Sequence, residues 1–122
     1  GLPGVEHRPA AMYSAFVSTG RMRAAELCRL LSTQPARQFG LYPRKGTLRV
    51  GSDADLVLWD GAAQWTITAR EQLQRSDYTP LEGMRATGRA KRVLLMGETV
   101  AEDGRVIREN LGQYAAREPT EV

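Results

Sequence analysis

The spacing of apolar residues changes once along the chain, and this change restricts the folds that the chain can adopt. Between residues 9 and 33, apolar side chains recur at steps of three and four, which is the period of a helix with one buried face. Ser18 and Gly20 interrupt this period, so the sequence predicts two helices, each of which needs a partner surface. The apolar positions are Met12, Ala15, Phe16, Ala24, Leu27, Leu30 and Leu31.

A short third helical turn is predicted next. Pro35 cannot continue a helix that runs to Thr33, because proline lacks the backbone N–H and its ring clashes with the preceding turn. Proline suits the first turn of a new helix, which would pass through Ala36 and Phe39. Gly40 would end that helix as its C-cap.

From Thr47 onward, the pattern becomes that of β-strands. Residues 56–59 form a short apolar run that Asp60-Gly61 would end, and residues 65–67 are rich in side chains that favour strands. These features predict two separate short strands. A turn-rich insertion follows at residues 69–83.

A hairpin is predicted where Gly97-Glu98 separates residues 92–96 from residues 99–101. Glycine at the first turn position favours a type II′ turn. Successive side chains of a strand point to opposite faces, so the first strand should present two sets of side chains. One face would carry Val93 and Leu95, and the other Leu94 and Met96.

A second hairpin is predicted at Asp103-Gly104, leading into residues 105–108. The fold class is therefore α+β, with N-terminal helices followed by a small antiparallel β-sandwich portion. We place the helical segment at residues 1–45 and the β portion at residues 46–109. The polar tail, residues 110–122, either docks on another surface or has no fixed structure.

Composition excludes several classes of protein. The net charge is +3, but the 17 basic residues are spread from Arg8 to Arg117 with acids between them, which indicates a solvated surface and no nucleic-acid partner. No apolar run approaches the ~20 residues of a membrane span, so no membrane partner is expected. Cys28 is the one cysteine, which excludes an intrachain disulfide and fits a reducing, cytoplasmic compartment.

The first residues have neither an initiator methionine nor the basic and apolar regions of a signal peptide. A chain that opens on a loop of glycine and proline is interpreted as a piece of a longer protein, and removal of a tag or processing is the alternative explanation for a first glycine.

The sequence contains no complete catalytic set. A hydrolytic metal centre needs several His, Asp or Glu ligands that converge on one point, and His7 is the single histidine. His7 is interpreted as an exposed or structurally hydrogen-bonded loop residue. Asp53 and Asp55 resemble a cation site, but the more common explanation is that they cap the backbone where a strand begins.

Nucleophilic catalysis finds no support either. No serine lies in a G-x-S-x-G turn, and no phosphate-binding glycine loop is present. Cys28 lies on the helical stripe beside Leu27 and Leu31, so we expect its side chain to be buried or half-buried and to pack against apolar neighbours. We therefore predict no catalytic residue and no metal ligand in this chain.

Several segments carry a resemblance that spacing alone cannot supply. In order along the chain they are GLPGVEHR at residues 1–8, PA at 35–36, FGLYPRKG at 39–46, GSDADLVLWD at 51–60, SDYTP at 76–80, EG at 82–83 and GQYAAR at 112–117. Together they resemble the C-terminal portion of the dihydropyrimidinase and D-hydantoinase family, within the amidohydrolase superfamily. The segments at 76–83 point most narrowly to this cyclic-amidase branch.

The resemblance implies a longer parent with a metal-bearing (β/α)₈ barrel and a β-sandwich built from both chain ends. The helices of this chain would be the last helices of that TIM-type barrel. Such enzymes open dihydropyrimidine or hydantoin rings with a hydroxide that bridges two zinc ions, held by four histidines, an aspartate and a carbamylated lysine. Those ligands would precede Gly1, so no cofactor is expected within this chain.

One loop of the chain would approach the substrate. In the family, an asparagine that contacts the substrate stands just before the segment that begins at Gly1. The resemblance therefore implies a substrate loop with four candidate residues, Gly1, Gly4, Glu6 and Arg8. We expect Glu6 and Arg8 to orient the loop by pairing with neighbours, and not to take part in the chemistry.

The expected role of this chain is structural, with the remainder of the parent barrel as its partner and a homo-oligomer as the assembly. Three alternatives stay open. The first alternative is that the parent is a related hydrolase, such as an allantoinase or a dihydroorotase. The second is that the parent is a non-catalytic scaffold like the collapsin response mediator proteins. The third alternative is a free-standing β module.

Overall fold

The computed structural model describes residues 1–120, which form two compact units that interleave along the sequence. The first unit contains Gly1–Ala24 and Asp60–Arg89, and the second contains Ala25–Trp59 and Ala90–Val122. The two longest strands contribute residues to both units. The predicted division at residue 45 follows the domains of the parent and stays a prediction. Residues 121 and 122 of the predicted tail lie outside the described residues.

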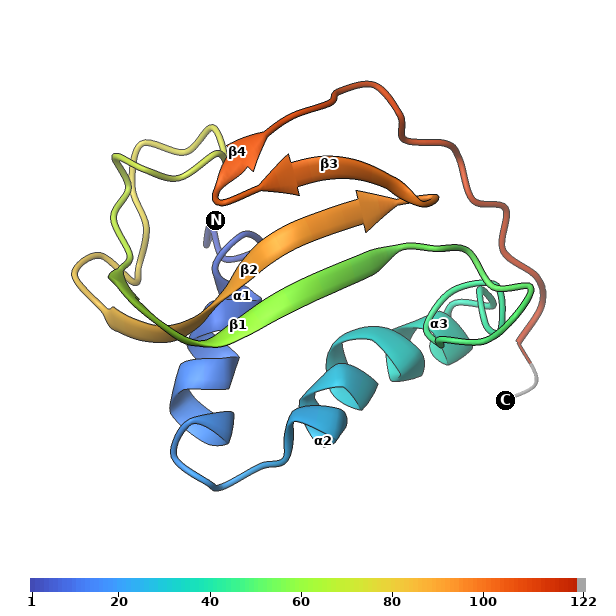
Figure 1. The fold of residues 1–122 in the computed structure, drawn as a ribbon, viewed down its shortest axis with the longest axis horizontal. Helices are drawn as coiled ribbons and strands as arrows, with labels where there is room; N and C mark the ends of the chain where they lie inside the picture. The colour runs from blue at the N-terminus through green and yellow to red at the C-terminus, as the bar shows by residue number, and fades with distance from the viewer. Residues whose placement is uncertain (121–122) are drawn as a thin grey trace. The chain divides into compact units, whose positions relative to one another are not determined.

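The first helix lies in the first unit (Figure 1). It begins as α1 (Arg8–Met12) and continues without a break into a π-helical turn, η1 (Tyr13–Val17). The wide turn is closed by the N–H of Ser18, which donates to the carbonyl of Tyr13 at 2.9 Å. No helix is assigned between Ser18 and Ala24, so the predicted break between two helices is confirmed.

The second helical stretch is made of α2 (Ala24–Cys28), the π-helical turn η2 (Arg29–Thr33) and α3 (Gln34–Gln38). Pro35 lies in the first turn of α3, as predicted. Gln34 donates its N–H to Arg29, five residues back, and keeps helical dihedral angles. The chain therefore passes from η2 into α3 without leaving the helical conformation, so the prediction that Pro35 separates a new helix from one that ends near Thr33 is wrong.

Gly40 ends α3, which confirms the predicted C-cap. Its φ is +69°, a left-handed conformation that glycine adopts at little cost. The N–H of Leu41 bonds the carbonyl of Ala36 at 2.8 Å, and the N–H of Gly40 bonds that of Arg37 at 3.3 Å. These two bonds form a Schellman motif.

One sheet contains four strands in the order β1-β2-β3-β4 (Figure 1). Their bounds are Leu56–Thr66, Arg85–Leu95, Glu98–Glu102 and Arg105–Val106. β2 pairs antiparallel with β3, and β3 pairs antiparallel with β4. The predicted α+β class with a small antiparallel β portion is confirmed, as is the absence of helix or strand across residues 69–83.

β1 corrects one prediction, because residues 56–66 form one continuous strand and not two short ones. Asp60-Gly61 is a turn signal in many sequences, but Gly61 meets a different need. A Cβ atom built on Gly61 would lie 2.4 Å from the hydroxyl of Tyr13. Glycine is therefore required for the close approach of the Tyr13 side chain, and the strand continues through it.

The β2–β3 hairpin corrects a second prediction. Leu95 pairs with Glu98, so the two turn residues are Met96 and Gly97 and not Gly97 and Glu98. Both have positive φ, 50° and 82°, which is typical of a type I′ turn instead of type II′. Met96 therefore has no place on a strand face. The turn predicted at Asp103-Gly104 is confirmed, since both residues have positive φ between Glu102 and Arg105.

The register of β2 and β3 shifts between Val93 and Leu94. Val93 pairs with Ala101 and Leu94 pairs with Thr99, so Val100 is the extra residue of a β-bulge. The carbonyl of Val100 accepts the N–H of Ile107 at 2.8 Å. The bulge thus keeps its main chain bonded to the residue that follows β4.

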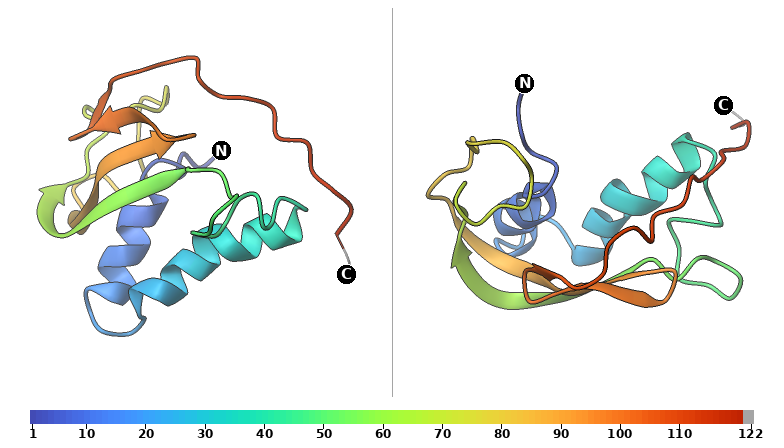
Figure 2. Two further views of the ribbon diagram at one scale, coloured as in Figure 1. Left: turned by 45° about the vertical axis from the view of Figure 1, so that its right-hand side comes forward. Right: turned by 90° about the horizontal axis from the view of Figure 1, so that it is seen from above.

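The second unit ends in an extended tail without helix or strand over residues 107–120 (Figure 2). The N–H of Glu118 donates to the carbonyl of Gly40 at 2.9 Å. Of the two behaviours predicted for the tail, docking is observed near Glu118, whereas residues such as Tyr114 (91% exposed) remain on the surface.

Cys28 corrects a further prediction, because its side chain is exposed. Leu27 is 6% exposed and Leu31 is half-buried, so the buried stripe of this helix passes beside Cys28. Consecutive residues of a helix point about 100° apart, and this turns Cys28 outward. Within residues 1–120, no helix is long and apolar enough to cross a membrane.

Candidate functional site

The candidate substrate loop, residues 1–8, belongs to the first unit and is bonded to the turn-rich segment of the same unit. Glu6 makes the main connection. Its carboxylate accepts the N–H of Leu73 at 3.0 Å (Oε1) and 2.8 Å (Oε2), and the N–H of Gln74 at 2.8 Å (Oε2). A carboxylate bonded to two successive main-chain N–H groups forms charge-assisted hydrogen bonds, which are stronger than neutral ones.

Two side chains of the turn-rich segment reach back to the start of the loop. The hydroxyl of Tyr78 donates to the carbonyl of Gly1. The side-chain amide of Gln74 donates to the carbonyl of Pro3 at 3.4 Å and to Gln72 at 2.8 Å. The loop is therefore held at both ends by residues that follow it by about 70 positions.

His7 belongs to the loop, and it is only 3% exposed. Its Nδ1 is 3.4 Å from the hydroxyl of Thr79, which also accepts the N–H of Leu81 at 3.2 Å. The ring of Trp65 lies beside it, with centroids 6.4 Å apart. Of the two interpretations left open for His7, structural hydrogen bonding is the one observed.

Three further candidates differ from Glu6. Gly4 accepts the N–H of Arg8 at 3.0 Å, which starts α1, but a Cβ on either Gly1 or Gly4 would meet no atom within 4 Å. Arg8 is exposed, and among residues 1–120 its guanidinium makes no hydrogen bond or ion pair. The pairing expected for Arg8 is absent from the described chain, whereas Glu6 is paired. Whether any of the four meets a substrate stays a prediction.

Asp53 and Asp55 are bonded to a lysine of the same unit. Lys45 Nζ lies 2.9 Å from Asp53 and also bonds Asp55, and Arg44 Nε lies 2.9 Å from Asp53. Asp55 additionally accepts the N–H of Met96 at 2.9 Å, which ties this loop to the β2–β3 turn. The two carboxylates are thus neutralised by side chains. The predicted cap of the local backbone is not observed, because the one main-chain partner, Met96, lies 41 positions from Asp55.

These bonds shift the pKa values of all three groups. The hydrogen bond from Lys45, helped by Arg44, lowers the pKa of Asp53. Burial raises the pKa of Asp55, but the bonds from Lys45 and from the Met96 N–H outweigh it and the net direction is down. The hydrogen bonds to Asp55 and Asp53 raise the pKa of Lys45. Each group therefore keeps its charge over a wider pH range, which is what a structural ion cluster requires.

The two-zinc centre implied by the resemblance does not fit these residues. The chain has one histidine, and in the part that the structure describes no three His, Cys, Asp or Glu side chains come together as metal ligands. No chemical step through zinc can therefore be assigned to this chain.

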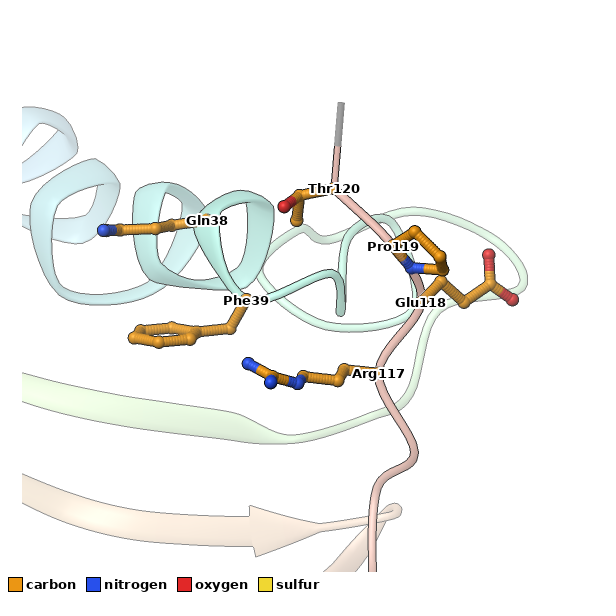
Figure 3. Close-up of a pocket in the computed structure, with 6 residues that line it drawn as sticks. All are labelled: Gln38, Phe39, Arg117, Glu118, Pro119 and Thr120. Carbon is orange, nitrogen blue, oxygen red and sulfur yellow. The ribbon is translucent and has the colours of Figure 1, made fainter. Parts of the chain in front are cut away.

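A pocket of about 290 Å³ lies in the second unit, between the end of α3 and the tail (Figure 3). The side chains of Phe39 and Arg117 extend alongside each other into it, and the Glu118 side chain points away. It is lined by Gln38, Phe39, Arg117, Glu118, Pro119 and Thr120. This set lacks the convergent titratable groups of a catalytic site.

Sequence reasoning missed the partners of Glu6. Leu73 and Gln74 contribute only main-chain N–H groups, which every residue except proline has, so no side chain signals them. Tyr78 lies in the SDYTP segment that carried the resemblance, and this was the one available sign that residues 72–79 matter.

Comparison with known proteins places this geometry in a family. The model of the amidohydrolase family matches residues 6–100. A D-hydantoinase from Ralstonia pickettii is 40% identical over 109 residues, which cover 89% of this chain and 24% of that protein. The chain therefore spans about a quarter of the length of the relatives that it matches.

Two solved structures extend the comparison. The D-hydantoinase (dihydropyrimidinase) from Thermus sp. has a TM-score of 0.86 and 39% identity, covering 89% of this chain and 24% of that one. The L-hydantoinase (dihydropyrimidinase) from Arthrobacter aurescens has a TM-score of 0.79 and 37% identity, covering 82% of this chain and 22% of that one. With a family model matched over most of its residues and a fold shared with hydantoinases, the chain belongs to the amidohydrolase family.

Proposed function

We propose that the chain is the C-terminal portion of a hydrolase that opens the ring of a cyclic amide, a hydantoin or a dihydropyrimidine. The observation that carries this proposal is the match to hydantoinases at 40% identity over nearly nine-tenths of the chain. The fold agreement with a hydantoinase at a TM-score of 0.86 supports it. In this proposal, the catalytic zinc ions and their ligands belong to the remainder of the parent, which is a protein of the cytoplasm.

The role proposed for this chain is structural. Its helices would pack against the remainder of the barrel, and its sheet would complete a β-sandwich and support a homo-oligomer. The second unit has exposed apolar side chains, which supports the proposal that another part of the parent covers them. Burying apolar surface lowers the free energy by roughly 25 cal/mol per Å². The exposed apolar side chains include Leu48 (83% exposed), Val50 (103%) and Val57 (58%).

Selectivity for the D or the L configuration of the substrate would depend on residues elsewhere in the parent. The D-hydantoinase and the L-hydantoinase described above share this fold at nearly equal identity, 39% and 37%. Because this chain is almost equally similar to a D-hydantoinase and to an L-hydantoinase, its overall similarity favours neither configuration of the substrate. In this proposal, the residues of the substrate loop hold residues 1–8 near the ring of the substrate, and they do not select its D or L configuration.

A chimeric enzyme tests the proposal. This chain replaces the matched quarter of the Thermus hydantoinase, and ring opening of hydantoin and dihydrouracil is followed by chromatography of the carbamoyl products. The unmodified enzyme is the positive control, and the same enzyme without this quarter is the negative control. We expect the chimera to open at least one ring and the truncated enzyme to open neither.

A chimera that folds and binds zinc but opens neither ring would contradict the proposal and favour the non-catalytic scaffold. The isolated chain is expected to retain no zinc after dialysis and to open neither ring, because it lacks a ligand set. Elemental analysis that found one or two firmly held zinc ions per isolated chain would also contradict the proposed division of roles.

A further inference from the structure

The link between Glu6 and the turn-rich segment consists of hydrogen bonds to a carboxylate, and not of contacts between apolar side chains. Leu2 and Val5, the apolar residues of this loop, are 77% and 79% exposed, so apolar burial does not hold them. The loop is held by hydrogen bonds, and three of these converge on one carboxylate. The Glu6 carboxylate therefore accepts more of these bonds than the carbonyl of Gly1 or of Pro3, and the buried ring of His7 adds packing at the end of the loop.

The chemistry of this link is specific to a carboxylate. Both oxygens of Glu6 accept from the N–H of Leu73, and one of them also accepts from the N–H of Gln74, so two donors make three bonds to one carboxylate. Glutamine at position 6 retains one acceptor oxygen and places an NH₂ donor against the Leu73 N–H. A carboxylate satisfies both N–H groups without such a conflict.

From this geometry we infer that Glu6 is a positioning residue for the ring-opening reaction. Its carboxylate fixes residues 1–8 on the segment at 72–79, so that the loop is already in place when substrate binds. This inference rests on the proposed function and adds to it the residue through which the loop is held. Prior ordering of a loop lowers the entropic cost of substrate binding, so loss of the link should raise KM more than it lowers kcat.

Three variants test the inference, namely Glu6→Ala, Glu6→Gln and the matched control Glu71→Ala. Glu71 is an exposed glutamate of the same turn-rich segment, and within residues 1–120 its carboxylate has no hydrogen bond or ion pair. Amide exchange at Leu73 and Gln74 is measured in the full chain. The N–H of Thr87, which bonds the hydroxyl of Ser14 at 2.8 Å, reports in each variant whether the first unit is folded.

We expect exchange at Leu73 and Gln74 to be about tenfold faster in Glu6→Ala, intermediate in Glu6→Gln and unchanged in Glu71→Ala, with Thr87 protected throughout. In the chimeric hydrolase, Glu6→Ala should raise KM about tenfold and change kcat little, with zinc content unchanged. Unchanged exchange in Glu6→Ala would overturn the inference, as would faster exchange with unaltered KM. Failure of the proposed function is recognised separately, because the chimera would then be inactive with Glu6 in place.

Discussion

The two units of the molecule differ in the interactions that stabilise each of them internally. The first unit contains most of the residues with the smallest exposed fractions in the described chain, namely His7, Ala10, Ile67, Thr79 and Ala86. The second has Leu27 and Ala36, and it depends more on the ion cluster around Lys45 and on main-chain bonds to the tail. The difference teaches that the loop with the candidate site residues belongs to the unit with more of the nearly fully buried side chains, and that the second unit relies more on polar surface contacts.

The strongest test of this difference is Ile67→Ala, because Ile67 is fully buried in the first unit. Truncation leaves a cavity and should lower the free energy of unfolding by about 2–4 kcal/mol. Val57→Ala is the control, since Val57 is 58% exposed, and it should change the free energy by less than about 1 kcal/mol. Urea unfolding followed by circular dichroism measures both, and equal losses would remove the contrast between the units.

In the second unit, the largest effect is expected from Gly40→Ala. The φ of Gly40 is +69°, and a Cβ would lie 1.9 Å from the carbonyl oxygen of Glu118, so the tail must move away. Gly20→Ala is matched in backbone conformation, with φ +76°, but its Cβ would meet no atom within 4 Å.

Both glycine substitutions should cost roughly 1–2 kcal/mol in backbone strain. Only Gly40→Ala should also release the tail, measured as faster trypsin cleavage after Arg117 and faster amide exchange at Glu118. Tail release in both variants, or in neither, would show that Gly40 does not hold the tail.

A smaller effect is expected from Lys45→Met, which leaves the carboxylates of Asp53 and Asp55 without their shared ammonium. The side chains are partly exposed, so the loss at pH 7 should be about 1 kcal/mol or less. Lys91→Met is the control, because Lys91 is exposed and takes part in no ion pair within the described chain. Thermal unfolding as a function of pH measures both variants.

The pH dependence has a defined sign. The pKa values of Asp53 and Asp55 are lowered in the folded chain, so the stability that they contribute is present above about pH 4 and is lost as pH falls through their folded pKa values. The pKa of Lys45 is raised, so its contribution is fully present below about pH 10 and is lost as pH rises through its folded pKa. A difference between wild type and Lys45→Met that persisted at pH 2 would exclude the ion pairs as its cause.

The smallest effect is expected from Cys28→Ser. The thiol is exposed, so the substitution should change the free energy of unfolding by less than about 0.5 kcal/mol. In the folded wild type, a thiol reagent should react with Cys28 at the rate of an accessible cysteine. Slow labelling together with a large loss of stability would restore the interpretation of Cys28 as a core residue.

Residues whose roles depend on near neighbours were predictable. The helix break, the first-turn position of Pro35, the C-cap at Gly40 and the turn at Asp103-Gly104 all follow from local backbone chemistry. Met96 was not predictable in this way, because methionine rarely takes positive φ and only the pairing of Leu95 with Glu98 forces it there.

Residues whose roles depend on distant contacts escaped prediction. Gly61 follows an aspartate and so has the sequence of a turn, but its role depends on Tyr13, 48 positions away. Glu6 was expected to pair with neighbours, yet nothing in the sequence points to main-chain groups at positions 73 and 74. The exposure of Cys28 has the same origin, because helical spacing fixes the width of a buried stripe only when its partner surface is known.

The partners of Glu6 also bear on how this segment can change in evolution. At position 73, Glu6 bonds the main chain, and the Leu73 side chain is 60% exposed. Any amino acid with a main-chain N–H preserves that bond, so we expect position 73 to accept many different residues. Position 6 should accept few, because the bond needs its carboxylate. Proline is the exception at position 73, since it alone would remove the donor. A deep mutational scan should therefore show broad tolerance at position 73 with a single forbidden residue.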